Sequence, residues 1–568
     1  MQISDEGIAR IKEILIRLLK ALILGLIPLG CAISYCAIKG GSLSRVYLPS
    51  SDLNDELFYY KQVEALVNGG IPKGYFGFNE SRALSLSFAA WSPVLLLPWT
   101  LIGLVFGWGI MTPVITNILF ICLGVGVFVF LADPDHKSMF VLGVLLVLNV
   151  PNTRYMLSGM SESLCVFMAL VYMGAAFMYL KSKKKDCPVF LFVWSFIMTL
   201  MRPYFLLFML FPAFLTAVRY KKKGALLSVF PVMGGLTGYA LLKHFFGAAY
   251  FTPLFSADWI TGFVKYGPFT GLKGLLSRFY YFFKNMVDHM TEGVRSGYFS
   301  GAVIDVYVIM LIIIALSFVM DIFKYRYWKK LNETGVEPSG RMKAEDALKL
   351  LKGKNKDTIE KVKARLFYEG FGIFSFIAMI AAVIMMYKIY EGSRHLVVFL
   401  MVGSCIIALM DTSGFKKASI VAVSLLFFFG IKGPGHAEYE LKFKAPDDDA
   451  RLAKMSQVFN DNLKVDYTEA PNYDNVVIWT VNDSFTDTET GKETITVTDW
   501  TRLYALPSGF GISCCQKDYI MENIKGDEIT LKSKYIACPE EGDIESLLEE
   551  KGFEPIAHDK DFKLYKLR

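Results

Sequence analysis

The chain has 568 residues, of which 54% are apolar, and its mean hydropathy is +0.40. These values exclude an ordinary soluble globular protein. The net charge of +7 does not form a basic stripe interleaved with stacking aromatic residues, so the sequence does not indicate nucleic acid as a partner.

Apolar blocks long enough to cross a membrane recur along the first 435 residues. A helix needs about 20 such residues to span a hydrocarbon core of about 30 Å. The first block has no A-x-A cleavage site behind it, so it is interpreted as a signal anchor. Arg202-Pro203 interrupts one block, which is typical of a helix that borders a cavity. The blocks are residues 14–38, 110–131, 138–151, 162–180, 188–218, 224–247, 302–323, 368–388, 396–411 and 416–432.

Basic residues near the ends of these blocks predict the topology, because such clusters stay on the cytoplasmic side. The N-terminus is then cytoplasmic, and so is a Lys- and Glu-rich loop at 324–366, which is predicted to be a solvated amphipathic hairpin. The scheme requires residues 86–107, with Pro93 and Pro98, to form a re-entrant segment. The clusters also suit an anionic inner leaflet, so membrane lipids are expected partners. The segments assigned to the outside are 39–109, 149–161, 248–301, 389–395 and the tail after Gly433.

Gly433-Pro434-Gly435 separates a membrane domain (1–435) from a tail (436–568). From Ala437 onward the tail has 27 Asp and Glu against 16 Lys and Arg, as expected outside the cell membrane. Strands are predicted at 475–481, 494–498, 562–567 and, as an option, 501–506. A helix over 544–550 is predicted to end at Gly552. The expected fold is a membrane all-α polytopic bundle of about 10–11 spans with a small C-terminal extracytoplasmic α/β domain.

The nine cysteines are scattered and form no metal or disulfide framework, although Cys514, Cys515 and Cys538 in the tail leave a disulfide open.

The loop after the first span opens with the acidic run Asp52-Leu53-Asn54-Asp55-Glu56. Asp52 can cap a helix that runs to about Asn68, with Asp55 and Glu56 stabilising its first turn. The same helix would fix where the carboxylates point, so a structural and a catalytic role are compatible. Asp52 and Asp55 would share a face, whereas Asp55 and Glu56 would diverge by roughly 100°.

Two further polar elements lie at predicted external span ends. Arg154-Tyr-Met-Leu-Ser-Gly-Met-Ser161-Glu162 precedes a span, and Ser161 can cap the following helix. Tyr390-Glu391-Gly392-Ser393-Arg394-His395 lies between two late spans, where Arg394 is either a phosphate ligand or an arginine among lipid headgroups. Arg202, inside an apolar block, is a functional candidate by its position; it either contacts phosphate or pairs structurally with Glu162.

Asp55-Glu56-Leu57-Phe58-Tyr59, placed directly after the first span, resembles the acidic motif of the GT-C glycosyltransferases. The chain is similar in layout to their protein O-mannosyltransferase and aminoarabinose transferase members over about residues 10–435. The resemblance implies an inverting hexosyl- or pentosyltransferase that takes a sugar from a polyprenyl-phosphate donor. The acceptor is a lipid, glycan or protein on the extracytoplasmic face, in cell-envelope assembly.

The resemblance also implies roles for individual residues. Asp55 is the base that deprotonates the acceptor, Glu56 orients it, and Asp52 is a weaker alternative to Asp55. Arg394 and His395 contact the donor phosphate, with Arg202 as a second contact, and Glu162 represents the second acidic motif. Some members hold a divalent metal between acidic residues of two external loops. Asp55 and Glu162 could act as such ligands, so a divalent metal stays an option. No other cofactor is expected.

Three rival functions remain open from the sequence. A polysaccharide polymerase or ligase of another fold would also bind lipid phosphate but does not need the Asp-Glu pair. A lipid or solute transporter predicts internal repeats and midplane charges, and the sequence contains no repeat. A non-catalytic scaffold would tolerate neutralisation of Asp55 and Arg394 together.

Overall fold

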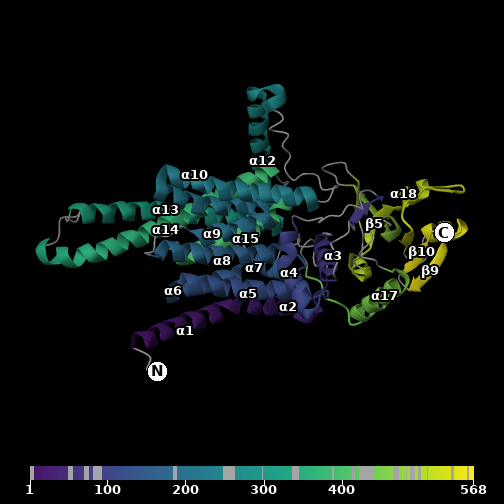
Figure 1. Cartoon of the computed structure of the whole chain (residues 1–568), viewed down its shortest axis with the longest axis horizontal. Coiled ribbons are helices and arrows are strands. Elements are labelled where there is room, and N and C mark those ends of the chain that lie inside the picture. The colour runs from purple at the N-terminus through teal and green to yellow at the C-terminus, as the bar shows by residue number, and fades with distance from the viewer. Residues whose placement is uncertain are drawn as a thin grey trace.

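The computed structural model describes residues 5–48, 55–68, 76–80, 92–182, 188–246, 263–296, 299–334, 344–386, 389–411, 414, 416–420, 441–464, 473–481, 483–486, 493–496, 500–507, 509–538, 543–559 and 562–567. Six described helices are long and apolar enough to cross a membrane, or seven if one bent pair counts as a span. A small α/β domain lies beyond one end of the helical bundle (Figure 1). The predicted fold class, a polytopic helical membrane domain with a C-terminal α/β domain, is confirmed.

The first span consists of α1 (Asp5–Gly25) and α2 (Ile27–Ile38), and it packs against α5 (Thr112–Ala132). Lys20 of α1 reaches Asp133 at the far end of α5, and a Cβ on Gly25 would lie 3.0 Å from the carbonyl oxygen of Cys122. The two spans are therefore antiparallel, and the intervening chain leaves and re-enters the bundle at the same end. Helix α4 (Pro93–Phe106) lies in this interval and packs on α3, α9 and α5, and the re-entrant segment at 86–107 stays a prediction.

The apolar block 188–218 does not form the single interrupted span that the sequence predicts. Helix α9 (Val189–Met201) runs antiparallel to α8 (Glu162–Lys181), and the first half of α10 (Leu206–Phe246) runs parallel to it. Arg202 bonds Glu162 at the start of α8, whereas Trp194 bonds the Met168 carbonyl and Tyr172 bonds the Phe208 carbonyl further along it, and these contacts fix the directions. The block is thus a helical hairpin, with Arg202 at its tip.

The physical cause of this hairpin lies in its two central residues. Arg202 is extended, with φ −146° and ψ 134°, and Pro203 starts the short helix η2 (Pro203–Phe205). Proline has no N–H to continue α9. A second reversal occurs inside α10 at Lys221, where φ is 53° and ψ is −135°. The returning half packs back on the first, with the Ser228 hydroxyl bonded to the Ala213 carbonyl.

The remaining bundle contains α6 (His136–Leu148) and α7 (Val150–Met156), bent by 63°, and the late helices α12 to α15. Helices α13 (Phe299–Thr334) and α14 (Ala344–Met386) pair antiparallel and project beyond the bundle, in agreement with the predicted hairpin at 324–366 (Figure 1). Helix α15 (Ile389–Leu409) packs on α13, α8 and α6, and α12 (Pro268–Ser296) precedes α13. The predicted span 416–432 lies mostly outside the described residues.

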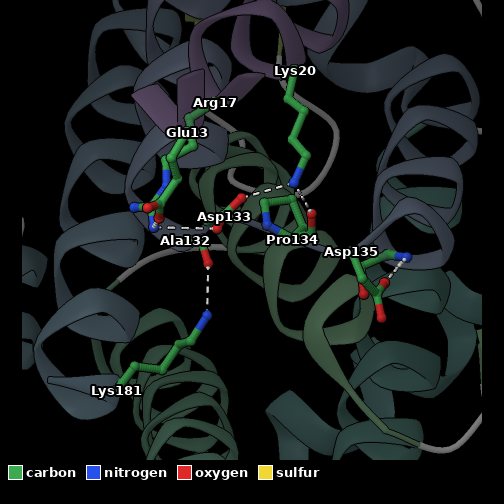
Figure 2. A network of polar contacts seen from close by, with 9 residues as sticks. Glu13, Arg17, Lys20, Ala132, Asp133, Pro134, Asp135 and Lys181 are labelled. Atoms are coloured by element: carbon green, nitrogen blue, oxygen red, sulfur yellow. Dashed lines mark hydrogen bonds and ion pairs between the residues drawn. The ribbon is translucent and has the colours of Figure 1, made fainter. Parts of the chain in front are cut away.

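Basic side chains tie several helices together at the end of the bundle opposite the α/β domain, here called the basic end (Figure 2). Lys20 Nζ lies 2.8 Å from Asp133 Oδ1, and Lys181 donates to the Ala132 carbonyl. Burial raises the pKa of Asp133, but the hydrogen bond and charge of Lys20 outweigh it and lower the pKa overall. Further contacts at this end are Lys416 to Ser138 and Lys324 to Asp411.

The tail contains a six-stranded sheet in the order β1-β5-β2-β8-β10-β9. The strand predictions at 475–481 and 562–567 are confirmed, and that at 494–498 is confirmed as far as Thr496, after which it lies outside the described residues. Residues 501–505 belong to a 3-10 helix, η5 (Trp500–Ala505), instead of a strand. Gly552 has φ +76° after α19 (Asp543–Glu550), as predicted for its helix end. The strands are β2 (Val476–Val481), β3 (Asp483–Thr486), β4 (Glu493–Thr496), β5 (Gly511–Gln516), β6 (Ile524–Lys525), β7 (Glu528–Ile529), β8 (Tyr535–Cys538), β9 (Glu554–Asp559) and β10 (Phe562–Lys566).

The first strand of this sheet comes from the segment between α2 and α5. Strand β1 (Phe76–Phe78) pairs in parallel with β5 of the tail. The carboxylate of Glu80 then accepts hydrogen bonds from the Lys532 and Ser533 backbone N–H groups and from the Tyr519 hydroxyl. The loop and the tail therefore form one folded unit. Cys514, Cys515 and Cys538 are buried in it as free thiols.

Candidate functional site

Helix α3 (Asp55–Val67) carries the first acidic motif and lies between the two parts of the protein. Tyr59 and Val63 belong to the core of the bundle, whereas Leu57, Phe58 and Tyr60 belong to the core of the tail. Asp55 is the first residue of the helix and is half-buried, and Glu56 is fully buried. The predicted helix start at the acidic run is confirmed from Asp55 onward; Asp52 lies outside the described residues.

The side chain of Glu56 fixes the loop that precedes α8. Its Oε2 accepts a hydrogen bond from the Gly159 N–H, with 2.7 Å between the nitrogen and the oxygen. A Cβ on Gly159 would lie 3.1 Å from that oxygen, so the contact favours glycine. Asn117 of α5 holds the same loop by donating to the Ser158 and Met160 carbonyls. The two acidic motifs are thereby brought together, because Glu162 follows Gly159 by three residues.

Glu162 takes part in a buried network with residues from two other segments. Arg202 donates to Glu162 Oε1 at 3.0 Å and to the Ser161 hydroxyl at 2.8 Å. Its other terminal nitrogen lies 2.7 Å from His395 Nδ1 of α15. All four side chains have exposures of 0%. The pairing of Arg202 with Glu162, one of two predicted roles for Arg202, is therefore present, and the phosphate-contact role stays a prediction.

Ser161 does not cap α8 as the sequence predicts: its side chain makes no capping hydrogen bond and instead accepts one from Arg202. A buried guanidinium with several N–H groups offers stronger donors than one backbone amide. Arg394 lies in α15 beside His395, but its side chain lies outside the described part of the chain, so its role is untested.

A buried lysine attaches α3 to the tail. Lys61 is 2% exposed and donates to the carbonyls of Tyr504 and Leu506 and to Glu64 Oε2, the last at 2.9 Å. Burying an ammonium is costly unless it is paired and hydrogen-bonded, and these acceptors meet that condition. The segment around η5 is consequently held against the helix that presents Asp55 and Glu56.

A polar cleft of about 630 Å³ opens beside this junction. Tyr504, one of its lining residues, packs on Tyr60 of α3 with 4.9 Å between ring centroids. On the α3 side the cleft is lined by Glu64 and Asn68, near the C-terminal end of the helix. Its walls come from α3, α17 (Asp448–Asn462) and the segment after η5, and include Glu64, Asn68, Ser456, Asn460, Lys464 and Tyr504.

Sequence reasoning overlooked Asp305, a buried acid near the start of α13. Tyr307 packs on Phe399 at 6.3 Å between ring centroids, and Met310 lies against Gly403, so α13 and α15 run parallel. Asp305 therefore lies at the depth of His395. Its Oδ2 has no hydrogen-bond partner among the described residues. The sequence feature that could have indicated Asp305 is a single acid inside an apolar run. Such an acid is costly in a membrane span unless it serves a function.

The described residues contain no group of three or more His, Cys, Asp and Glu side chains that could hold a metal ion. Glu56 and Glu162 each use one carboxylate oxygen for a protein hydrogen bond. The donor set for the divalent metal that the sequence left open is thus not assembled from the described part of the chain.

The fold and this site define a polytopic membrane protein with a buried ionic network where the bundle meets its α/β domain. No protein-family model and no curated protein matches the chain. Its shape is similar to the oligosaccharyltransferase of Archaeoglobus fulgidus, solved with zinc and sulfate, at 11% identity and a TM-score of 0.45, over 92% of this chain and 68% of that one.

The shape is also similar to ArnT from Cupriavidus metallidurans, over 98% of each chain. The identity is 10%, and the TM-scores are 0.37 for the apo state and 0.35 for the complex with undecaprenyl phosphate. All three TM-scores are below 0.5, so the likeness is distant.

Proposed function

We propose that this protein is an inverting membrane glycosyltransferase that moves a sugar from a polyprenyl-phosphate donor to an acceptor outside the cytoplasm. The observation that carries the proposal is the hydrogen bond between Glu56 and Gly159. It joins the acidic motif after the first span to the acidic motif before α8, two segments about 100 residues apart. A glycosyltransferase needs an oriented carboxylate at the mouth of a membrane cavity, whereas a transporter or scaffold does not need this link.

In the proposed chemical step, Asp55 is the base. Its carboxylate takes the proton of an acceptor hydroxyl while the hydroxyl oxygen bonds to the anomeric carbon of the donor. The bond from that carbon to the phosphate oxygen breaks, and the electron pair leaves on the polyprenyl phosphate. One displacement inverts the configuration at the anomeric carbon. Asp55 is suited to this role because it is half-buried, whereas Glu56 beside it is fully buried and engaged.

The phosphate that leaves gains negative charge, and Arg394 is the proposed cation that stabilises it. Arginine stays charged and can bond phosphate through two N–H groups at once. Charge that is fixed before the reaction stabilises the transition state more than the ground state. The neighbouring contact between His395 and Arg202 would hold this part of α15 in place, so the buried network acts as a support and not as a substrate ligand.

The polar cleft between α3, α17 and the segment after η5 is the proposed route of the acceptor. Glu64 lies nine residues after Asp55, so this wall begins about 14 Å along the helix from the base. Its polar lining includes the Ser456 hydroxyl and the Asn68 and Asn460 amides, together with the charged side chains of Glu64 and Lys464. The cleft would take a hydroxyl-bearing acceptor. The α/β domain and the cleft are placed on the extracytoplasmic side, because the basic end then faces the anionic inner leaflet.

Transfer by the purified protein in liposomes tests the proposal. A radiolabelled undecaprenyl-phosphate sugar is supplied with a crude cell-envelope acceptor fraction, and label in a water-soluble or lipid product is measured. Transfer that is abolished in the double variant Asp55→Asn/Arg394→Gln supports a glycosyltransferase. Label that only crosses the bilayer, without a new glycosidic bond, would identify a transporter instead. Equal transfer by the double variant would remove Asp55 and Arg394 from catalysis, and no transfer by the parent would favour the scaffold function.

A further inference from the structure

A lateral groove of about 670 Å³ opens between α10, α13 and α14, away from the site described above. Phenylalanine side chains from all three helices line it, among them Phe214, Phe318 and Phe371. Phe214 and Phe374 are about half exposed at its opening, where the lipid surrounds a membrane bundle. The aromatic pairs Phe211–Phe371 and Phe214–Phe367 show that α10 and α14 run antiparallel along it.

The two polar residues of the groove lie at one end of it. Lys363 and Tyr325 line that end, on α14 and α13 respectively. Nearby, Arg365 bonds Asp321, which places this end of the groove toward the basic end of the bundle. Lys363 is exposed and has no ion-pair partner among the described residues. The groove is therefore apolar along its length and positively charged at the end nearer the membrane surface.

The length of the groove matches one leaflet of a bilayer. From Lys363 to Phe374 there are eleven residues of α14, or about 16 Å at 1.5 Å per residue. Half of a hydrocarbon core of about 30 Å is about 15 Å. An acyl chain can thus lie along the phenylalanines while its headgroup reaches Lys363.

We propose that this groove binds one anionic phospholipid of the leaflet at the basic end, with its phosphate at Lys363 and Tyr325. The inference does not depend on the transferase activity, because the groove lies at the opposite leaflet from Asp55. Charge complementarity selects an anionic headgroup, and the apolar lining selects an acyl chain. A single lysine near a membrane surface is worth about a fivefold preference for an anionic lipid.

Gly370 provides the test of the groove. A Cβ at this position would lie 3.4 Å from Phe318, an ordinary contact, so Gly370→Ala is tolerated and leaves the groove open. Gly370→Leu fills it. Lys363→Gln removes the charge at an exposed position and cannot unfold the bundle, and Lys330→Gln, another exposed lysine of the same end, is its matched control.

The measurement is native mass spectrometry of the full chain released from nanodiscs that contain equal parts of phosphatidylglycerol and phosphatidylcholine with the same acyl chains. The expected result is one retained phosphatidylglycerol in the parent, Gly370→Ala and Lys330→Gln. Retention falls about fivefold in Lys363→Gln and is lost in Gly370→Leu. Equal retention of the two lipids, or unchanged retention in both Lys363→Gln and Gly370→Leu, overturns the proposal. Displacement of the phospholipid by equimolar undecaprenyl phosphate also overturns it, because the occupant is then the carrier lipid.

Discussion

Arg202 and Glu162 form an ion pair with no solvent exposure on either side chain, at 3.0 Å between nitrogen and oxygen. The pair joins the tip of the α9–α10 hairpin to the start of α8. Such a pair is weak as a source of net stability, but removing one partner leaves an uncompensated buried charge. Its contribution is therefore to hold the hairpin tip and α8 in one arrangement beside the acidic motifs.

This arrangement gives a double-mutant prediction. Arg202→Met or Glu162→Gln alone should each destabilise the protein by about 3–5 kcal/mol, because the remaining partner stays buried. The combination should cost clearly less than the sum of the two. Thermal unfolding in detergent of the parent, both single variants and the double variant measures the coupling. Additive losses would show that the two side chains do not interact.

Asp55→Asn should lower turnover by roughly 10²–10⁴-fold, the usual contribution of a general base. The amide keeps the size of the carboxylate, so donor binding and the melting temperature should stay near the parent values. Single-turnover transfer from a saturating donor separates chemistry from binding. Asp518→Asn, an exposed acid of the tail, is the matched control. A parent-like rate in Asp55→Asn would remove this residue from the chemical step.

Asp305→Asn distinguishes a structural from a functional role for the overlooked acid. A buried carboxyl without a partner costs stability, so the amide should raise the melting temperature or leave it unchanged. If Asp305 contributes to the site, turnover should nevertheless fall, by about tenfold or more for a group that touches the reacting atoms. A more stable variant with unchanged turnover would assign Asp305 to the bundle alone.

Glu80→Gln should loosen the connection between the α2–α5 segment and the tail. The carboxylate accepts from two backbone N–H groups and from the Tyr519 hydroxyl, and hydrogen bonds to a charged group contribute about 1.5–3 kcal/mol each. Limited proteolysis should cut the variant in the tail faster than the parent, while the helices stay protected. Glu528→Gln, exposed in the same domain, should be cut like the parent.

The carboxyl group of Asp135, at the basic end, should give the stability of the protein a small pH dependence. It caps α6 (His136–Leu148), and the Ser138 backbone N–H bonded to its carboxylate lowers the pKa of Asp135 below the ordinary value. The charged form is thus favoured in the folded state. Its stabilisation is complete above the unfolded pKa of about 3.9 and is lost as the pH falls through the folded pKa.

Asp135→Asn keeps the cap but removes the charge. At pH 6 the free energy of unfolding of the parent should exceed that of the variant by roughly 0.3–1 kcal/mol. The difference is small because solvent screens this exposed carboxylate. The gap should narrow as the pH falls below about 4, through the lowered pKa of Asp135 in the folded state. Thermal unfolding across this range measures it, and a gap that widens on acidification would contradict the assignment.

Several features were predictable from the sequence because they depend on local chemistry. The acidic start of α3, the helix before Gly552 and the β-branched strand β2 follow from capping and side-chain preferences. The hairpin at Arg202 was not predictable in this way, since two short helices and one interrupted span share the same hydropathy. The three-residue strand β1 has too few residues for a period, and its pairing depends on a segment far along the chain.

The contacts of the buried network were also not predictable from local sequence. Glu162, Arg202 and His395 were each singled out on chemical grounds, but their mutual contact depends on how α8, α9 and α15 pack. Asp305 was missed because one acid near the end of an apolar run resembles a boundary residue. Packing between distant segments, and not local preference, decides these contacts.

The strand that the α2–α5 segment contributes to the tail has a consequence for biosynthesis. Residues 76–78 leave the ribosome about 430 residues before β5, the strand they pair with. At 5–20 residues per second, roughly 20–90 s separate the two. During this time β1 has no strand to pair with, and the tail, once made, exposes β5 as an open edge until the loop returns to it. A separately expressed tail would keep that edge and should self-associate, so secretion of the domain as an independent fragment requires residues 76–80 to be supplied with it.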